Sequence, residues 1–450
     1  MEDLKKTELF ERVPVPDAVM RLAVPTILSS LVMVLYNLAD TYFVGMLDNP
    51  VENAAVLLAF NAVNNLFGVG SSSMMSRALG RRDYDTVYRS SAFGFYCCII
   101  CSVLFSAICT IGKTPLLGLL GADAQTAAST AGYLKWTVTF GATPAILNVV
   151  MAYLVRAEGA SLHASVGTMS GCLLNIILDP LFILPWGFGM GAAGAGLATF
   201  LSNCAACLYF FILLYRKRGN TYVCIRPSMF RFRKEIVRGV FGVGVPASIQ
   251  NLLNVTGMTV LNNFTSAYGA DAVAAMGITQ KINMVPMQIS MGLSQGIMPL
   301  VSYSYASKNV KRMKETLLFV VKIAMGFIVT VSVGYFLFAG NLIRLFMENE
   351  AIVMYGTKFL RGFCLGLPFL CMDFIAVGVF QASGLGKHAL VFAILRKIVL
   401  EIPALFLLNA IFPLYGLAYA QFAAELILAV SAVAVLVRLF RRLEGEKEAG

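Results

Sequence analysis

Long apolar runs separated by short polar connections make up most of the chain. Twelve runs are long enough to cross a bilayer as an α-helix, which takes about 20 mostly apolar residues. They lie near residues 18–46, 52–79, 90–112, 127–154, 161–184, 191–215, 240–267, 271–305, 315–341, 351–381, 388–412 and 415–438. The pattern predicts an all-α polytopic membrane protein with twelve transmembrane helices.

The composition agrees with this pattern. Of the 450 residues, 58% are hydrophobic and 13% are charged, whereas soluble domains carry about 25% charged residues. The first six residues, Met1-Glu-Asp-Leu-Lys-Lys, contain two acids, and no small-residue cleavage site follows the first run. We therefore expect the first run to be a retained helix and not a signal peptide.

Basic residues mark one side of the predicted spans. The formal net charge is +11 at pH 7. The cations gather in alternate connections: Lys5, Lys6 and Arg12; Arg81, Arg82 and Arg89; Arg216, Lys217, Arg218, Arg226, Arg231, Arg233, Lys234 and Arg238; Lys308, Lys311, Arg312 and Lys314; Lys387; Arg438, Arg441 and Arg442. By the positive-inside rule both termini and the middle connection face the cytoplasm. The charge indicates orientation, and we expect no nucleic-acid partner.

The two halves of the chain repeat each other at a nearly constant offset. Three positions in the first half have counterparts of the same type in the second: Pro25 with Pro246, His163 with His388, and Gly194 with Gly416. Six helices is an even number, so the halves form parallel repeats. We predict an N-terminal lobe over 1–215, a basic cytoplasmic linker over 216–238 and a C-terminal lobe over 239–450.

One polar pair interrupts the fifth predicted span. Asn175 and Asp179 are four residues apart and so share one face of a helix. A carboxylate at the centre of a membrane helix costs roughly 2.5–3.5 kcal/mol. Pro180 has no N–H, which leaves the carbonyl of Ile176 without its helical partner. These oxygens suit a proton or a small cation; the alternative is a carboxylate that only clamps two helices together.

The first and sixth predicted spans add further polar groups. Tyr36 and Asp40 are again four apart, and Thr199 supplies a hydroxyl. If Asp40 and Asp179 meet, their charges repel, and one proton or cation is held between them. Pro25 removes one hydrogen bond from the first span, which then either bends during function or carries a static kink. In the second half, Leu261, Leu400 and Ala404 replace Asp40, Asn175 and Asp179, so this cluster belongs to the N-terminal lobe alone.

The second half carries other acids inside predicted spans. Glu401 has Arg396 and Lys397 close by, so we expect it to pair with a cation. Asp373 has no cation within a helical turn, which suggests a cavity role. Met287 and Met291 belong to a methionine stripe that either lines a cavity accepting varied ligands or packs on a neighbouring helix.

No ATP motif or catalytic cluster accompanies these groups. Gly384-Leu-Gly-Lys387 lacks the full phosphate-loop spacing, and His388 follows it. We predict that the chain is not an enzyme and uses no cofactor. Transport would then draw on an ion gradient, worth roughly 2.3 kcal/mol per charge per 100 mV.

The chain resembles the multidrug and toxic compound extrusion (MATE) family, and within it the DinF/MepA-like branch, over all twelve spans. The segments that carry this resemblance are Leu22-Ala-Val-Pro25, Tyr36 with Asp40, and Asn175-x-x-x-Asp179-Pro180. The resemblance implies a V-shaped pair of six-helix lobes that exports lipophilic, often cationic, compounds by antiport. It also implies that Tyr36, Asp40, Asn175, Asp179 and Thr199 form a proton or cation network, with Pro25 as the bending point of the first helix. Asp373 matches an acid that another branch uses in the C-terminal lobe, whereas the accompanying glutamate is Asn254 here. A candidate C-terminal cavity would thus contain Asn254, Met287, Met291 and Asp373.

The expected function is proton- or Na⁺-coupled multidrug export, which confers antibiotic resistance. We expect the protein to lie in the bacterial cytoplasmic (inner) membrane, as a monomer in contact with membrane lipid. Na⁺ could bind at Asp40, Asn175 and Asp179, whose oxygens suit a proton equally well. A lipid-linked oligosaccharide flippase of the same superfamily is the alternative. It should carry cavity cations and extra helices.

Overall fold

A computed structural model describes residues 2–47, 54–119 and 126–448. In these ranges every regular element is a helix, as predicted, and we find no strand there. Two compact units divide the chain: an N-terminal unit of residues 24–248, and a C-terminal unit of residues 249–450 together with 1–23. The lobe boundaries predicted from the repeat stay a prediction, because the units are grouped by contacts and differ from the lobes near residues 23 and 248.

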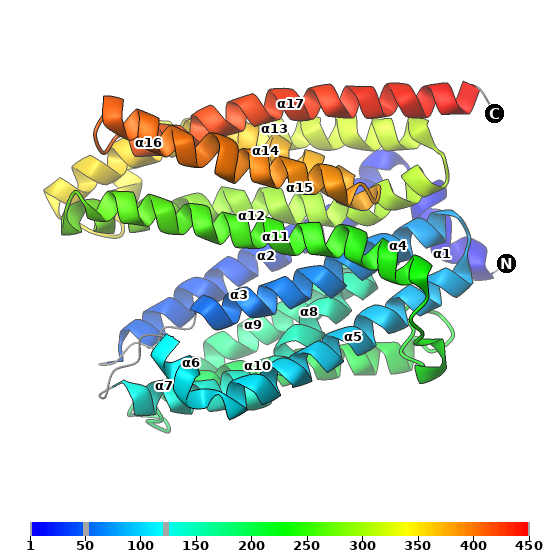
Figure 1. The fold of residues 1–450 in the computed structure, drawn as a ribbon, viewed down its shortest axis with the longest axis horizontal. Helices are drawn as coiled ribbons and strands as arrows, with labels where there is room; N and C mark the ends of the chain where they lie inside the picture. Colours follow the sequence, from blue (N-terminus) through cyan, green and yellow to red (C-terminus); the bar gives the residue numbers. More distant parts are fainter. Residues whose placement is uncertain (1, 48–53, 120–125, 449–450) are drawn as a thin grey trace. The chain divides into compact units, whose positions relative to one another are not determined.

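Figure 1 shows the helices of each unit running alongside one another. The N-terminal unit contains most of α2 (Val15–Gly45), then α3 (Ala54–Val63), η1 (Asn64–Val69), α4 (Gly70–Gly80), α5 (Tyr84–Ile111), α6 (Lys113–Leu119), α7 (Ala127–Leu134), η2 (Lys135–Phe140), α8 (Ala142–Ala157), α9 (Ser161–Ile183), α10 (Ala192–Arg216) and η3 (Pro227–Met229). The C-terminal unit contains α1 (Glu2–Glu11), most of α11 (Lys234–Ser266), α12 (Ala270–Ala306), α13 (Val310–Arg344), α14 (Glu350–Ala382), α15 (Gly386–Ile394), η4 (Leu395–Glu401), α16 (Ile402–Ile411) and α17 (Gly416–Glu448).

The long helices account for the predicted spans. Within the described ranges, eight helices are long and apolar enough to cross a membrane, and the number is nine if residues 127–140 and 142–157, which bend by 50°, form one span. The other three predicted spans coincide with α12 and with two segments in which a π-helical stretch joins shorter helices without a break, 54–80 and 386–411. Twelve long helical segments therefore stand at the twelve predicted positions.

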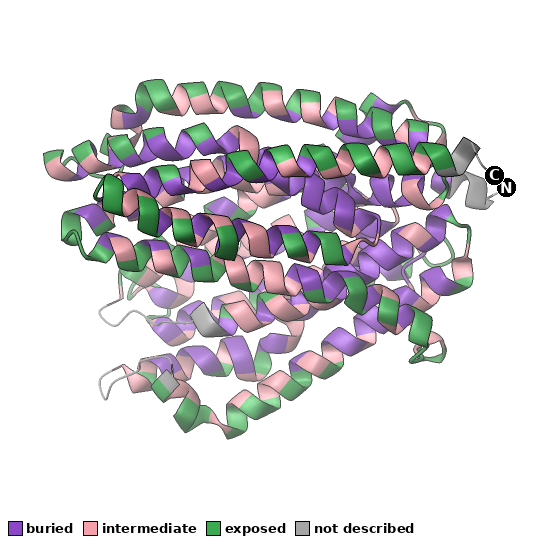
Figure 2. Ribbon diagram, turned by 45° about the horizontal axis from the view of Figure 1, so that its top comes forward, coloured by how far each residue is buried: buried purple, intermediate pink, exposed green. Residues whose placement is uncertain are grey.

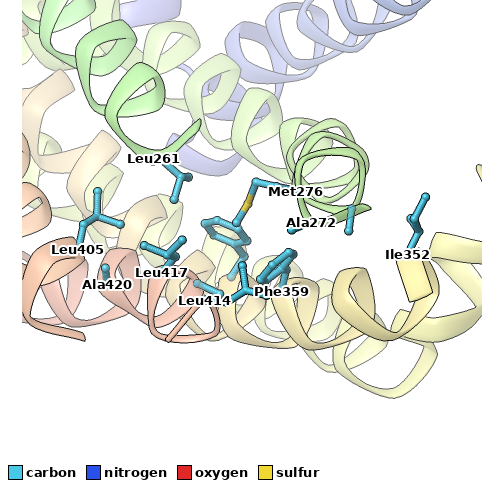
Figure 3. Close-up of a cluster of buried hydrophobic side chains, with 12 residues drawn as sticks. Leu261, Ala272, Met276, Ile352, Phe359, Leu405, Leu414, Leu417 and Ala420 are labelled. Atoms are coloured by element: carbon cyan, nitrogen blue, oxygen red, sulfur yellow. The ribbon is translucent and has the colours of Figure 1, made fainter. Parts of the chain in front are cut away.

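Helix α14 lies at the centre of the C-terminal unit. In its most apolar stretch 78% of the residues are buried, against 28–39% in the other apolar helices. It packs against α12, α13, α15 and α17. Phe359 of α14 belongs to a core with Leu261, Met276 and Leu417 (Figure 3). Along most other helices, exposed residues alternate with buried ones (Figure 2), as expected for helices with one face toward lipid.

The internal repeat is visible in a pair of matching turns. Arg82 and Lys308, which occupy corresponding places in the two halves, both have positive φ, 58° and 56°. Each is followed by a residue that caps the next helix: Asp83 accepts from the Thr86 N–H and Asn309 accepts from the Arg312 N–H. The backbone N–H groups of Asp83 and Asn309 also donate to carbonyls five residues earlier in both copies. The internal sequence repeat explains why the two turns have the same conformation.

The first residues of each repeat pack in the unit that is formed mainly by the other repeat. Phe10 of α1 stacks on Tyr303 of α12 with ring centroids 5.0 Å apart, inside the C-terminal unit. A Cβ placed on Gly296 of α12 would lie 2.8 Å from the Cα of Ala23, so only glycine allows this approach. In the N-terminal unit, Ser248 of α11 donates to the Ala62 carbonyl at 2.7 Å. Helices α2 and α11 thus each begin in one unit and continue into the other.

Candidate functional site

A stripe of four residues on α9 positions the polar pair predicted in the fifth span. Gly167, Gly171, Asn175 and Asp179 follow one another at intervals of four and are all buried, so they form one face of the helix. The glycines let α10 come close: a Cβ on Gly171 would lie 3.2 Å from the Cβ of Ala206. The same face therefore presents Asn175 and Asp179 to α10.

Asn175 links Asp179 to α10. In the amide orientation that satisfies both neighbours, the Asn175 nitrogen donates to Asp179 Oδ2 at 2.8 Å and its oxygen accepts from the Thr199 backbone N–H at 3.1 Å. The Thr199 hydroxyl lies 3.3 Å from the same amide. The Asp179 side chain is 0% exposed, and its Oδ1 has no hydrogen-bond partner among the described residues.

Helix α2 brings the remaining predicted groups to the same region of the N-terminal unit. The carboxylates of Asp40 and Asp179 are close enough for their charges to repel each other. The Tyr36 hydroxyl lies within electrostatic reach of both carboxylates and of Tyr133 and Cys172. All five predicted network residues therefore lie in one region, with Tyr36, Asp40 and Thr199 only partly buried.

This arrangement can hold one proton or one small cation. A fully buried carboxylate with an oxygen that lacks any partner is costly if it stays charged and alone. A proton on Asp179 removes the charge, and a cation among carboxylate, amide and hydroxyl oxygens neutralises it. A second carboxylate nearby strengthens the requirement, because two like charges in a buried site cannot both remain ionised without compensation.

Pro25 lies inside α2, which continues through it without interruption. It stands two residues beyond Ala23, where the chain passes from the C-terminal unit to the N-terminal unit. Proline cannot donate to the carbonyl of Arg21, so the helix lacks one backbone bond there. A static kink and a moving bend are both compatible with this position, and the hinge stays a prediction.

The C-terminal unit holds a separate, buried ion cluster. Arg396 of η4 donates to Glu425 of α17 at 2.7 Å and lies 3.4 Å from Asp373 of α14. Lys397 pairs with Glu401 at 2.6 Å, which confirms the expected cation partner of Glu401. The five side chains carry three acids and two cations, so their formal sum is −1.

Asp373 thus has a cation beside it that the spacing within one helical turn could not reveal, because Arg396 comes from a different helix. Among the residues that the structure describes, Asp373 Oδ1 has no hydrogen-bond partner and Oδ2 lies beside Arg396, so neither oxygen is bonded to Asn254, Met287 or Met291. The C-terminal cavity formed by these four residues stays a prediction.

Twelve long apolar helical segments, an internal duplication and carboxylates buried among these segments define the class: a polytopic helical membrane transporter. The sequence profile of the MatE family matches residues 25–181 and 246–407. The chain belongs to this family.

Relatives agree over nearly the whole length. The multidrug export protein MepA of Staphylococcus aureus (strain MRSA252) is 33% identical over 442 residues, 96% of each chain. MepA of Staphylococcus saprophyticus is 33% identical and covers 97% of each chain. Among solved structures, the outward-facing conformation of a multidrug resistance MATE family transporter of the MOP superfamily superposes with a TM-score of 0.88 at 26% identity, covering 98% of this chain and 99% of the other. These relatives are transporters and not enzymes, and they confirm the predicted family and its MepA-like branch.

Proposed function

We propose that this protein is a secondary active exporter that moves lipophilic, cationic compounds out of a bacterial cell in exchange for protons or Na⁺. The ion is held at Asp40 and Asp179 in the N-terminal unit, with Tyr36, Asn175 and Thr199 supplying hydrogen bonds. The full-length similarity to proteins named as multidrug export proteins supports the export of varied small compounds.

One observation carries the coupling site. Asp179 is completely buried, one of its oxygens accepts from Asn175, and the other has no partner among the described residues. Such a group is stable when it binds a proton or cation and unstable as a lone charge. Ion entry and release at Asp179 would therefore alter the hydrogen bonds between α9 and α10. If drug and ion favour different states of the transporter, the two fluxes are coupled.

The alternation of basic connections supports a location in the cytoplasmic membrane with both termini inside. No cofactor enters this mechanism, and a monomer is sufficient because the proposed ion site lies within one unit of one chain.

Efflux of a fluorescent lipophilic cation from proteoliposomes tests the proposal, with a proton gradient or a Na⁺ gradient imposed separately. Transport driven by only one gradient identifies the coupling ion. Asp179→Asn and Asp40→Asn should each abolish driven efflux while the protein remains folded. Asp271→Asn removes an exposed acid at the start of α12 and should leave efflux unchanged. Wild-type efflux by both site variants would overturn the coupling site, and no efflux under either gradient would favour a lipid-linked sugar as substrate.

A further inference from the structure

A groove lies beside the connection between α10 and α11, entirely within the N-terminal unit. Its volume is about 520 Å³, within the usual range of ligand sites of about 300–1,000 Å³. We call it the linker groove. Its walls include Tyr88 of α5, Phe211 and Leu214 of α10, Arg218 and Arg226 of the connection, and Met229 of η3.

The connection is fixed in place. The Thr221 hydroxyl and the Tyr222 backbone N–H donate to Glu158 at 2.9 and 2.6 Å. The Tyr96 hydroxyl of α5 donates to the Ile225 carbonyl at 2.7 Å, and the Cys224 N–H donates to Ser91 Oγ at 2.9 Å. These bonds hold residues 221–225 against the helices, so the groove is preformed and its occupant need not order a loose loop.

The two arginines of the groove differ from others nearby. Arg233 of the same connection and Arg89 of α5 both pair with Asp85, at 3.1 and 2.7 Å. Arg218 and Arg226 are exposed, and neither pairs with an acid in the part of the chain that the structure describes. Residues 216–238 contain eight cations and a single acid, Glu235. The groove therefore combines an apolar wall with two arginines available to an anion.

The surroundings place this groove at the edge of a membrane. Its apolar wall is the last part of α10, a helix apolar enough to span a bilayer. Tyr215, which lines the groove, is 78% exposed, and exposed aromatic side chains gather at membrane–water interfaces. Basic clusters just beyond a transmembrane helix attract anionic lipids.

We propose that the linker groove binds an anionic phospholipid. Arg218 and Arg226 hold its phosphate through charge-assisted hydrogen bonds, and the acyl chains begin along Phe211 and Leu214 and continue beside α10. A soluble phosphate compound would bind the arginines but would not contact the apolar wall. This site is distinct from Asp40 and Asp179 and does not depend on the direction or ion of transport.

Native mass spectrometry of the purified full-length protein tests the proposal, with phosphatidylglycerol or phosphatidylcholine of the same acyl chains added. We expect phosphatidylglycerol to bind at least about tenfold more tightly. The double variant Arg218→Gln/Arg226→Gln should bind it about 30-fold more weakly, which corresponds to about 2 kcal/mol. The matched control Arg216→Gln/Arg231→Gln removes the same charge from exposed residues outside the groove and should stay within about threefold of wild type.

Equal losses in the groove variant and the control would overturn the proposal, because bulk charge would then explain the attraction. Phe211→Ser changes no charge and should also weaken phosphatidylglycerol binding; unchanged binding would overturn the role of the apolar wall. Displacement of the lipid by equimolar glycerol 3-phosphate would assign the groove to a soluble anion instead. Unfolding temperatures measured for all variants identify any that fail to fold, and in that case the Phe211→Ser result decides.

Discussion

Replacement of Arg396 by glutamine removes the cation that contacts both Asp373 and Glu425 in the C-terminal unit. These acids are 1% and 0% exposed, so water cannot solvate the two carboxylates once the cation is gone. The formal charge of the buried cluster changes from −1 to −2, while Lys397 remains paired with Glu401. We expect Arg396→Gln to destabilise the protein strongly.

The expected magnitude follows from the geometry. Removing one partner from a buried, hydrogen-bonded ion pair costs about 3–5 kcal/mol, a large part of the roughly 5–15 kcal/mol by which proteins are usually stable. Adding Asp373→Asn restores the formal charge to −1. The double variant should therefore recover about 1–3 kcal/mol relative to the sum of the single changes.

Denaturant unfolding in detergent micelles, followed by circular dichroism, measures these differences. Arg361→Gln is the matched control: Arg361 and Arg396 each lie 5.3 Å from the centre of a phenylalanine ring, but Arg361 is exposed and donates to a backbone carbonyl. Its loss should cost under about 1 kcal/mol. The reasoning fails if Arg396→Gln costs no more than this control, or if Asp373→Asn makes Arg396→Gln worse.

Two further predictions concern the N-terminal unit. Gly171→Val should overpack the α9–α10 contact at a cost of about 1–3 kcal/mol and slow efflux by separating Asn175 from α10, whereas the exposed neighbour Leu173→Val should not; wild-type efflux by Gly171→Val would contradict the close contact. Burial raises the pKa of the Glu158 carboxyl above its ordinary value near 4.5, against hydrogen bonds from the linker. Between the ordinary and the raised pKa, the folded state binds more protons than the unfolded state. The free energy of unfolding should therefore fall as the pH rises through the raised pKa. Thermal unfolding between pH 4 and 8 should show this component in wild type and not in Glu158→Gln, and equal slopes would refute it.

The fold could largely be predicted from the sequence because a bilayer demands long helices whose apolar runs are visible without an alignment. The boundaries of α9 and α12 agree with the predicted spans to within a few residues. The π-helical stretches η1, η2 and η4 could not be predicted, because the extra residue of a π-helical turn shifts the faces of the helix but leaves the length and apolar character of the run unchanged.

The site was predictable where its residues share a helix. The spacing of Asn175 and Asp179 indicated a common face, and Gly167 and Gly171 at the same interval would have indicated which face meets α10. Pairs formed between helices carried no such signal. The bond between Arg396 and Glu425 joins residues 29 apart on different helices, and only tertiary packing determines it.

The exchange of α1 and the start of α11 between the units has a consequence for synthesis and assembly. Residues 1–23 leave the ribosome first, yet their packing partners, such as Gly296 and Tyr303, are made only in the second half of synthesis. Residues 239–248 belong to the predicted C-terminal lobe but pack in the N-terminal unit. Neither half of the chain therefore contains all the residues of one compact unit. If the chain were divided in the linker and the halves produced separately, each would lack a segment that the other carries, and they should become stable only when made together.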